Sequence, residues 1–530
     1  MDIMRFKHTP PRLPDNRSAA EIRLQCLGRR LSRDETLSDK YRLGMADLIA
    51  KGHASKVADE EVARSSGVVW YLPHHPVVSP KKPNKVRIVF DCAAKYKRIS
   101  LNDEVLQGPE LTNQLIRVLL RFRQQSVAVM ADIVAMFHQV RVTPDERDVL
   151  RYLWWPNGDR SKNPETYKMN VHLFGGTWSP SCCNFALQQL AKDNENHFET
   201  VTVNTVLRNF YVDDCLKSVD DENEAIELVR ELTDLLSRGG FKLTKWVSTS
   251  RKVLASMIEA DRSQGVKNID LCYREKLPTD RALGVSWNVE NDCFVFKMSH
   301  RDSPLTRRGL LSTACSVYDP MGFISPYTVI AKRIFQDLTR NKSGWDEPLP
   351  DRESREWLQW LNDLVKIESV KIRRCLKLPD MKEVEYRLHH FSDASNTAYG
   401  VVTYLRAVSC SGIVNCSLLM AKSRLAPIKT QTMPKLELMA ATLAVKVDQM
   451  IQRELDLPLA KSVFWTDSTI VLQYIRNEQR RFHTFVANRI AVIRDASLPQ
   501  QWRHVTAEEN AADDVSRGLN ADDLIGRLRW

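Results

Sequence analysis

Hydrophobic and polar positions along the chain follow patterns that predict helices and strands. Residues 17–65 carry mixed charge and predict short helices, whereas residues 68–90 are rich in valine and proline and predict strands separated by turns. Apolar residues with helical spacing predict a helix at 226–236, which Gly239-Gly240 should end. Further short strands are predicted at 127–133, 203–210 and 216–219.

The second half of the chain resumes this alternation after a helical stretch. Residues 305–366 predict helices with prolines between them, and the charged segment 377–385 predicts a linker. Beyond it, the pattern predicts a long helix at 435–455 and strands at 387–393, 399–405 and 462–466. Strands that alternate with helices are typical of layered α/β domains, so we expect one at 386–516. The predicted fold class is therefore multidomain, with α+β and α/β parts.

Composition and charge narrow the classes of partner. The 530 residues are 43% hydrophobic, and 77 Lys and Arg against 66 Asp and Glu give a net charge of +11. This excess favours a polyanionic partner such as nucleic acid. No apolar run approaches the roughly 18 residues of a membrane span, and no signal peptide is evident, so we expect no membrane partner. The eleven cysteines contain no Cys-x-x-Cys pair, which argues against a zinc ribbon.

Two adjacent aspartates give the strongest local signal for chemistry. Asp213 and Asp214 follow Tyr211-Val212 between two predicted strands, and like charges held this close repel each other. A divalent cation relieves that repulsion, and Mg²⁺ prefers carboxylate oxygens. Asp132, near the end of strand 127–133, could add a third carboxylate, and the three could hold two metal ions about 3.5–4 Å apart. The alternative is a solvated turn without a ligand.

Two other segments carry residues suited to nucleotide binding. Phe174-Gly175-Gly176 forms a turn in which glycine allows close backbone approach to a template or nucleotide. Lys82, Lys85 and Arg87 form a basic strand and turn suited to a triphosphate. The alternatives are an ordinary loop and a solvated run of charge.

A second set of carboxylates lies in the C-terminal region. Two of them, Asp393 and Asp467, follow predicted strands, Glu437 begins a predicted helix, and Asp513 lies in the segment EENAADDVSRG. Each alone is more simply explained as a solvated acid or a helix cap. Together they form a second candidate set of metal ligands.

Taken in order, the motifs of this chain resemble the reverse transcriptase and ribonuclease H of BEL/Pao-class long-terminal-repeat retrotransposons. The resemblance extends from about residue 20 to the C-terminus and rests on seven blocks: WYLPHHPV, VRIVFDCAAK, SLNDEVLQGPEL, ADIVAMFHQV, HLFGGTWSPS, FYVDDCL and ALGVSW. It implies a right-hand polymerase of fingers, palm and thumb, then a helical connector and a ribonuclease H-like domain.

The resemblance also implies roles for the polymerase residues. Asp132, Asp213 and Asp214 match the metal-binding triad of the palm. The incoming triphosphate would contact Arg87, with Lys85 or Lys82 nearby. Phe137 would be an aromatic gate that excludes a ribose 2′-hydroxyl. Phe174, Gly175 and Tyr211 would contact the template and the nucleotide. Lys245 would be the general acid for pyrophosphate.

For the C-terminal region the resemblance implies the four-carboxylate site of ribonuclease H, formed by Asp393, Glu437, Asp467 and Asp513 around two magnesium ions. Asp513 is preferred to Asp514 because Asn510-Ala511-Ala512-Asp513 aligns better with the family's Asn-x-Ala-Asp. Part of the connector region is labelled a Pao-type A17 peptidase in this class. Peptidase activity is not expected, because no Asp-Thr/Ser-Gly turn occurs in the chain.

The expected function is an RNA- and DNA-directed DNA polymerase with ribonuclease H activity, using Mg²⁺ or Mn²⁺, upstream of DNA integration. Expected partners are an RNA template, a DNA or tRNA primer, the RNA/DNA hybrid and deoxynucleoside triphosphates. The alternative is an inactive or domesticated nucleic-acid-binding relic. We expect part of a larger polyprotein in cytoplasmic virus-like particles, with the nucleus as an alternative location and the oligomeric state left open.

The resemblance also divides the chain. The expected parts are an N-terminal helical lead at 1–69, the fingers and palm at 70–295, and a thumb or connection at 296–385. The ribonuclease H-like domain is expected at 386–516 and a tail at 517–530.

Overall fold

The computed structural model describes residues 4–63, 68–79, 82–267, 269–271, 275–298, 303–377, 384–479, 481–527 and 530. Its contacts divide the chain into two compact units. The first contains residues 1–113, 132–215 and 228–244, and the second contains residues 114–131, 216–227 and 245–530. This division interleaves segments of the first half of the chain, so it differs in kind from the five consecutive domains of the sequence prediction, whose boundaries stay predictions.

The first unit begins with two helices of equal length. Asp34 caps the second of them by accepting a hydrogen bond from the backbone N–H of Leu37 at 2.9 Å. The helices of this part are α1 (Arg17–Ser32), α2 (Glu35–Ala50), α3 (Asp59–Ala63), α4 (Leu101–Glu104), α6 (Met136–Gln139), α7 (Ser179–Asp193) and α8 (Thr200–Arg208). Its small sheets are formed by β1 (Ala54–Lys56), β5 (Arg151–Trp154) and β6 (Glu165–Met169), and by the hairpin of β2 (His74–Ser79) and β3 (Lys82–Phe90).

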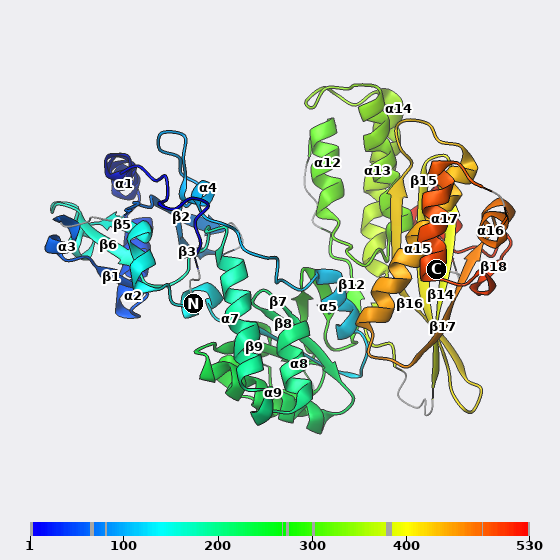
Figure 1. The fold of residues 1–530 in the computed structure, drawn as a ribbon, viewed down its shortest axis with the longest axis horizontal. Helices are drawn as coiled ribbons and strands as arrows, with labels where there is room; N and C mark the ends of the chain where they lie inside the picture. The colour runs from blue at the N-terminus through cyan, green and yellow to red at the C-terminus, as the bar shows by residue number, and fades with distance from the viewer. Residues whose placement is uncertain are drawn as a thin grey trace. The chain divides into compact units, whose positions relative to one another are not determined.

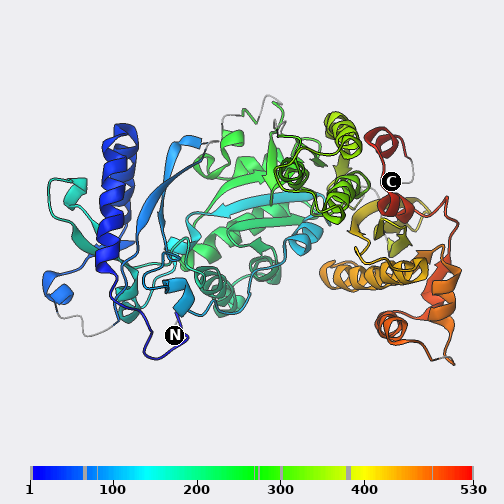
Figure 2. The same ribbon diagram turned by 90° about the horizontal axis from the view of Figure 1, so that it is seen from above.

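A four-stranded sheet with the order β7-β8-β4-β9 positions the first set of carboxylates. Its strands are β7 (Phe210–Tyr211), β8 (Asp214–Val219), β4 (Val127–Ile133) and β9 (Leu243–Ser248). Figures 1 and 2 show helices α8 and α9 (Glu222–Arg238) beside this sheet. Gly240, with a φ of 77°, follows the end of α9, which confirms the predicted helix stop.

One predicted strand is wrong. Residues 203–210 do not form a strand, because residues 200–208 form helix α8 and only Phe210 and Tyr211 extend into β7. The valines and threonines of this segment suggested a strand, yet the buried side chains of Thr202, Val203, Thr205 and Val206 follow helical spacing. The Thr205 hydroxyl donates to the carbonyl oxygen of Val201 at 2.7 Å, as threonine does inside helices.

The second unit is built on a five-stranded sheet with the order β16-β15-β14-β17-β18. Neighbours among β16, β15 and β14 are antiparallel, whereas β17 runs parallel to β14 and β18 runs parallel to β17. The strands are β14 (Glu385–Ala394), β15 (Ala398–Val408), β16 (Val414–Leu425), β17 (Leu459–Thr466) and β18 (Trp502–His504). Four helices accompany this sheet: α15 (Met433–Glu454), α16 (Thr469–Arg476), α17 (Thr484–Ala496) and α18 (Ala512–Arg517).

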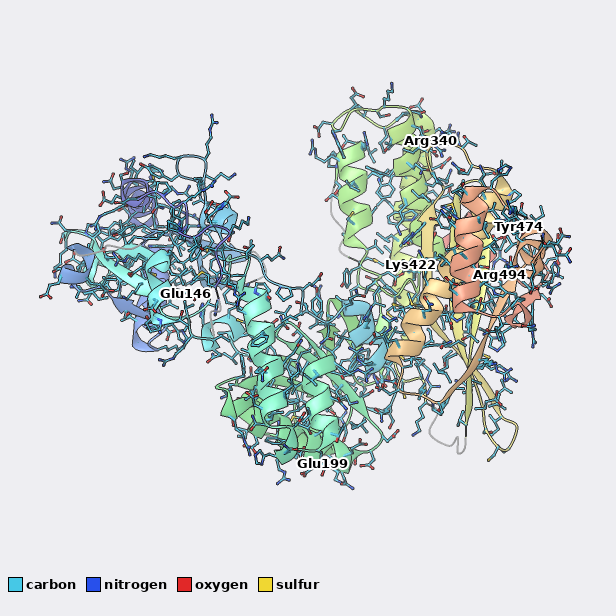
Figure 3. All side chains as sticks on the ribbon, viewed as in Figure 1. Glu146, Glu199, Arg340, Lys422, Tyr474 and Arg494 are labelled. Carbon is cyan, nitrogen blue, oxygen red and sulfur yellow. The ribbon has the colours of Figure 1, made fainter. Side chains whose placement is uncertain are left out.

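Alternation along β14 assigns its two faces. Tyr386, Leu388 and His390 are buried, and His390 Nε2 lies 2.9 Å from Asp448 Oδ1 on α15. These even-numbered residues therefore face α15, and the odd-numbered ones face the other side of the sheet. On the helical side, Arg494 of α17 donates to the carbonyl oxygens of Ile475 and Asn477, which ties α17 to the end of α16 (Figure 3).

Helices and a second small sheet lead into this domain. The helices are α10 (Arg251–Ser256), α11 (Gln264–Lys267), α12 (Arg307–Ser316), α13 (Ser325–Arg340), α14 (Asp351–Asp363) and, at the C-terminal end, α19 (Ala521–Gly526). The sheet has the order β10-β11-β12-β13, formed by β10 (Thr279–Ala282), β11 (Val285–Asn288), β12 (Cys293–Val295) and β13 (Lys371–Arg373). The predicted helical stretch at 305–366 is confirmed. The predicted linker lies largely outside the described residues. None of the described helices combines the length and apolar composition of a membrane span.

A buried ion pair joins helix α5 (Leu115–Phe122) to the end of α15. Arg121 and Glu454 are 3% and 7% exposed and form a salt bridge, and Arg117 lies 3.2 Å from the other carboxylate oxygen of Glu454. Glu454 is the last residue of its helix, where the helix dipole disfavours a negative charge. The two arginines offset this cost.

Replacing Glu454 by glutamine is expected to destabilise the second unit by about 3–5 kcal/mol, because Arg121 would remain buried without its counter-charge. Urea unfolding followed by circular dichroism measures the loss. Arg453→Gln, an exposed neighbour on the same helix, should change the free energy of unfolding by no more than about 0.5 kcal/mol. Equal effects of the two substitutions would show that the ion pair adds nothing.

The Asp319 carboxylate is buried in the turn that precedes α13 and accepts two backbone hydrogen bonds there. Its Oδ1 and Oδ2 accept hydrogen bonds from the backbone N–H groups of Phe323 and Ile324 at 2.9 and 2.8 Å. Burial nevertheless raises the pKa of Asp319 to about 6, well above the ordinary aspartate value of 3.8. The folded protein therefore holds this proton more tightly than the unfolded chain does, so the stability that Asp319 contributes is largest below pH 4 and is lost as the pH rises through 6.

Asp319→Asn removes this titration. We expect the melting temperature of the variant to rise relative to wild type between pH 4.5 and 7.5, with a change of about 2 kcal/mol in relative stability. Asp346→Asn is the control, because a hydrogen bond from Arg308 lowers the pKa of Asp346. Asp346 is therefore ionised in the folded and the unfolded chain throughout this pH range, and the melting temperature of Asp346→Asn relative to wild type should not change with pH. Melting curves that differ by a constant amount at every pH would contradict the expected role of Asp319.

Candidate active sites

Asp132 and the pair Asp213 and Asp214 lie at the same end of two neighbouring strands. Strand β8 begins at Asp214 and is the neighbour of β4, in which Asp132 is the residue before last. The backbone N–H of Ile133 donates to the carbonyl oxygen of Asp213 at 2.8 Å. All three aspartates are partly exposed. The structure thus brings the predicted triad together at one edge of the sheet.

The turn between β7 and β8 holds an unusual backbone conformation. Val212 has a φ of 56°, in the left-handed region that a β-branched residue rarely adopts. Tyr211 pairs with Asp214 across this turn, and the Asn113 amide donates to the carbonyl oxygen of Phe210 at 2.9 Å. Backbone strain of this kind concentrates at functional sites. Here it keeps two carboxylates next to each other at the tip of a hairpin.

The predicted gate and the predicted template loop meet as one aromatic pair. The ring centres of Phe137 and Phe174 are 4.7 Å apart, with Phe137 buried and Phe174 46% exposed. Gly175 follows with a φ of 113°, and a side chain there would place its Cβ 2.9 Å from the carbonyl oxygen of Phe90. Glycine is therefore required at this position both by conformation and by space.

The remaining predicted residues of the polymerase region are more dispersed. Arg87 is exposed in β3, opposite Val77 of β2. The backbones of Lys82 and Lys85 belong to β3, but their side chains lie outside the described part. Lys245 is exposed in β9 with a φ of 56° and belongs to the second compact unit. Its role as a general acid stays a prediction.

In the second unit, Asp393 and Asp467 lie at the ends of adjacent parallel strands. The pairing of β14 with β17 sets Ser392 opposite Thr466, the residues immediately before the two aspartates. Asp393 is 5% exposed, and its Oδ2 accepts a hydrogen bond from the Ser516 hydroxyl at 2.5 Å. Parallel pairing therefore places both carboxylates at the same sheet edge, an arrangement that the family resemblance implied.

Helices α15 and α18 supply the other two carboxylates. Glu437 lies in the second turn of α15, and its Oε2 accepts a hydrogen bond from the Ser468 hydroxyl at 2.6 Å. Ser468 directly follows Asp467, so this bond ties the helix to the strand end. Asp513 lies in the first turn of α18 and has its Oδ1 2.5 Å from Arg517 Nε.

The charges of these groups act on one another. The pKa of Asp393 is raised to about 7, mainly by burial and also by the charges of Asp467 and Asp513, whereas the hydrogen bond from Ser516 opposes the rise. Burial also raises the pKa of Glu437, and the charge of Asp467 adds to this rise. Burial likewise raises the pKa of Asp467, and the charge of Asp513 adds to it. The four predicted carboxylates therefore share one electrostatic environment.

The electrostatics also bear on the choice between two neighbouring aspartates. Asp514 is 1% exposed, and its Oδ1 lies 3.5 Å from Arg527 Nη1. The charge of Asp513, by contrast, raises the pKa of both Asp393 and Asp467. The assignment of Asp513 stays a prediction, and this asymmetry is in line with it.

Sequence reasoning missed the residues that orient the carboxylates. Ser468 and Ser516 donate hydrogen bonds to acids of the site, and the Asn510 amide donates to the carbonyl oxygen of Ser392 at 3.2 Å. Their signal was present in the spacing, because Ser516 lies one helical turn after Asp513. His504 pairs with Thr466 across β17 and β18, and its charge lowers the pKa of Asp467.

Neither set is preassembled as a metal cluster. Within the described ranges, no group of three or more His, Cys, Asp or Glu side chains is gathered closely enough to hold a metal ion. The fit to a cation therefore depends on the chemistry of the donors, because each set offers hard carboxylate oxygens at one sheet edge. In the second unit, the charges of Asp467 and Asp513 raise the pKa of Asp393, and the charge of Asp513 raises the pKa of Asp467.

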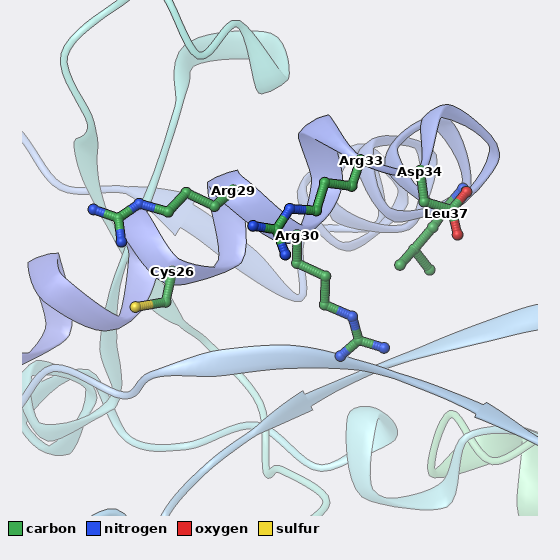
Figure 4. A pocket seen from close by; sticks show the side chains of 6 residues that line it. All are labelled: Cys26, Arg29, Arg30, Arg33, Asp34 and Leu37. Carbon is green, nitrogen blue, oxygen red and sulfur yellow. The ribbon is translucent and has the colours of Figure 1, made fainter.

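A basic pocket in the N-terminal helices belongs to neither set of carboxylates. It has a volume of 390 Å³ and is lined by Cys26, Arg29, Arg30, Arg33, Asp34 and Leu37 (Figure 4). Three guanidinium groups against one carboxylate make it electropositive, but it lacks the paired acids that metal-dependent chemistry requires. Pocket volume therefore does not locate the candidate chemistry in this chain.

Two family models match consecutive parts of the chain. Residues 79–250 match the reverse transcriptase (RNA-dependent DNA polymerase) model, and residues 306–468 match the Pao retrotransposon-like RNaseH-like domain. The first match includes the triad of Asp132, Asp213 and Asp214, and the second includes Asp393, Glu437 and Asp467. No curated protein matches the chain.

Solved structures of a foamy viral protease-reverse transcriptase share the fold. The dRH form in complex with ds DNA is 15% identical with a TM-score of 0.56, over 87% of this chain and 68% of that chain. The form in complex with RNA/DNA hybrid is 14% identical with a TM-score of 0.53, over 88% of this chain and 52% of that chain. The predicted fold class, a polymerase followed by a ribonuclease H-like domain, is confirmed. Together, the two family matches place a reverse transcriptase part and a Pao retrotransposon-like RNaseH-like part in one chain, which supports the resemblance to BEL/Pao-class reverse transcriptase–ribonuclease H proteins.

Proposed function

We propose that this chain copies RNA into DNA and degrades the RNA strand of the resulting hybrid, with each activity served by one set of carboxylates. The observation that carries the proposal is the convergence of acids at two sheet edges: Asp132 with Asp213 and Asp214, and Asp393 with Asp467. Acids gathered in this way repel one another, and a site for divalent cations resolves that repulsion. The two family matches support the same pair of activities.

In the polymerase, Asp132, Asp213 and Asp214 would hold Mg²⁺ or Mn²⁺. When bound, such ions lower the pKa of the attacking 3′-hydroxyl and stabilise the charge on the departing pyrophosphate. The aromatic pair of Phe137 and Phe174 would lie against the incoming nucleotide and exclude a ribose 2′-hydroxyl. Arg87 would pair with the triphosphate, since guanidinium groups bind phosphate oxygens in bidentate fashion.

In the ribonuclease H-like domain, Asp393, Glu437, Asp467 and Asp513 would hold the cations that activate water against the RNA phosphodiester. The Ser468 and Ser516 hydroxyls orient Glu437 and Asp393, and binding of the cations would draw the four carboxylates closer together. The net charge of +11 supports binding along the phosphates of a duplex, and such binding should weaken as salt rises.

Primer extension on an RNA template tests the proposal. The wild-type chain, supplied with a DNA primer, deoxynucleoside triphosphates and Mg²⁺, should extend the primer and shorten the RNA. EDTA should stop both reactions, and excess Mg²⁺ added afterwards should restore them, because the carboxylates alone supply no electrophile. Folded protein that neither extends the primer nor cuts the RNA with Mg²⁺ or Mn²⁺ would overturn the proposal.

A further inference from the structure

One part of the five-stranded sheet presents aromatic rings and arginines instead of a packed core. The odd-numbered residues of β14 face away from α15, and their partners on β15, β17 and β18 point to the same side. We refer to this surface as the aromatic face, formed by Arg387, His389, Phe391, Arg406, Trp465 and Arg503. None of these side chains is fully buried, and Arg503 is exposed.

Three rings of the aromatic face lie nearly parallel. The ring centres of Trp465 and Phe391 are 5.9 Å apart at an interplanar angle of 11°, and those of Trp465 and His389 are 6.0 Å apart at 17°. Tyr404 stands edge-on to Phe391, with ring centres 6.0 Å apart. Beside these rings is a pocket of 240 Å³, lined by His389, Phe391, Tyr404, Arg406, Cys416, Glu509 and Ala511.

Arginines surround these rings. The Arg503 guanidinium lies 5.7 Å from the ring centre of Trp465. Arg387 forms an ion pair with Glu385 at 2.6 Å, whereas Arg406 and Arg503 have no ion-pair partner among the residues that the structure describes. Glu509 is the acidic member of the pocket lining. Three cations around one aromatic cluster, with two of them uncompensated, favour an anionic ligand.

His389 adds a directed hydrogen-bond donor. The Trp465 indole N–H donates to His389 Nδ1 at 3.1 Å, so a neutral imidazole carries its proton on Nε2. The pKa of His389 is lowered to about 4, mainly by burial and also by the charges of Arg406, Arg387 and Arg503, which keeps the ring neutral. His389 Nε2 has no hydrogen-bond partner in the described part of the chain. A buried donor of this kind costs stability unless a ligand accepts a hydrogen bond from it.

The aromatic face is separate from the carboxylates. Phe391 and Tyr404 pack at the edge of a small core formed by Val402, Ala421, Ala512 and Val515. Two of these core residues belong to α18, the helix that carries Asp513, so the helix occupies the sheet surface next to the rings. A ligand on the aromatic face would therefore bind beside the carboxylate site and not in it.

We propose that the aromatic face binds a single-stranded segment of nucleic acid, with unpaired bases stacked on the rings and phosphates paired with Arg406 and Arg503. Flat rings flanked by arginines suit this ligand, because every base has a stacking face and every linkage carries a negative charge. Paired bases in a duplex present no free faces, so a duplex should not bind here. The inference goes beyond the proposed function, since it requires neither polymerisation nor cleavage.

Photocrosslinking tests this inference directly. The full chain is mixed in EDTA, which prevents cleavage, with a single-stranded RNA or DNA oligonucleotide that carries 5-iodouracil, and is then irradiated and digested for mass spectrometry. Adducts are expected on Phe391, Tyr404 or Trp465. In the double variant Arg406→Glu/Arg503→Glu their yield should fall about tenfold, because two phosphate contacts become repulsive. A difference between the RNA and DNA arms would identify the preferred strand.

The matched control is Lys446→Glu/Arg453→Glu, which makes the same change in charge on the exposed surface of α15, behind the sheet. Its adduct yield should equal that of wild type, and both variants should melt cooperatively. Adducts confined to other parts of the chain, equal losses in the two variants, or equal adducts from a blunt RNA/DNA hybrid would overturn the inference. Dimerisation of wild type that the Arg406→Glu/Arg503→Glu variant loses would assign the face to a second copy of the chain instead.

Discussion

Asp213→Asn is expected to lower the rate of primer extension on an RNA template by about a thousandfold. The substitution keeps the shape of the side chain and removes a charge that, under the proposed function, would hold a divalent cation at the turn between β7 and β8. Such a cation would supply several kcal/mol of charge stabilisation in the transition state, so its loss should appear mainly in kcat. Single-nucleotide incorporation, measured under saturating deoxynucleoside triphosphate and primer–template, gives this rate.

The same variant should still cut the RNA of a preformed hybrid at a rate within about twofold of wild type, because Asp213 is not among the four carboxylates of the ribonuclease H-like domain. Asp145→Asn, an exposed aspartate in the same compact unit, is the control for loss of one negative charge and should extend primers normally. Unchanged extension by Asp213→Asn would remove the triad from the proposed mechanism.

Asp467→Asn is expected to have the reciprocal effect. RNA cleavage should fall by about a thousandfold, while primer extension stays close to wild type. The charge of Asp467 raises the pKa of Asp393 and of Glu437, so Asp467 interacts electrostatically with two other acids of the site. A hybrid with end-labelled RNA, resolved by electrophoresis after incubation with Mg²⁺, measures cleavage alone.

Stability provides an independent measurement on the same variant. In EDTA at pH 8, Asp467→Asn should melt no lower than wild type, since it removes a charge that burial and Asp513 disfavour. Asp495→Asn on α17 is exposed and serves as the control. Cleavage that persists in Asp467→Asn would exclude this residue as a ligand, even if the hybrid still binds.

Local patterns predicted many of the strands and helices on which the candidate residues lie. The strand at 127–133 was predicted with its bounds, because a short apolar run that ends in an aspartate is a strong local signal. The helix at 435–455 was predicted to within two residues. Helix α8 was missed, since valine and threonine favour strands locally and only packing against the sheet decides otherwise.

Contacts between distant segments could not be predicted from local patterns. The pairing of Ser392 with Thr466 follows from the parallel register of β14 and β17, which no periodicity reveals. The hydroxyls of Ser468 and Ser516 were overlooked because serine is common at helix starts and in loops. The aromatic face was invisible for a similar reason: Phe391, Trp465 and Arg503 come from three strands and meet only in the folded sheet.

The salt bridge between Arg121 and Glu454 bears on how this protein can change during evolution. These residues are 333 positions apart, and each lies in a different one of the two family matches. A crossover between related elements at residues 378–383 would exchange one partner without the other. Chimaeras made there should be recovered as folded protein only when both parents carry compatible charges at these positions. The two activities are therefore expected to be inherited as one block and to show correlated substitution across this pair.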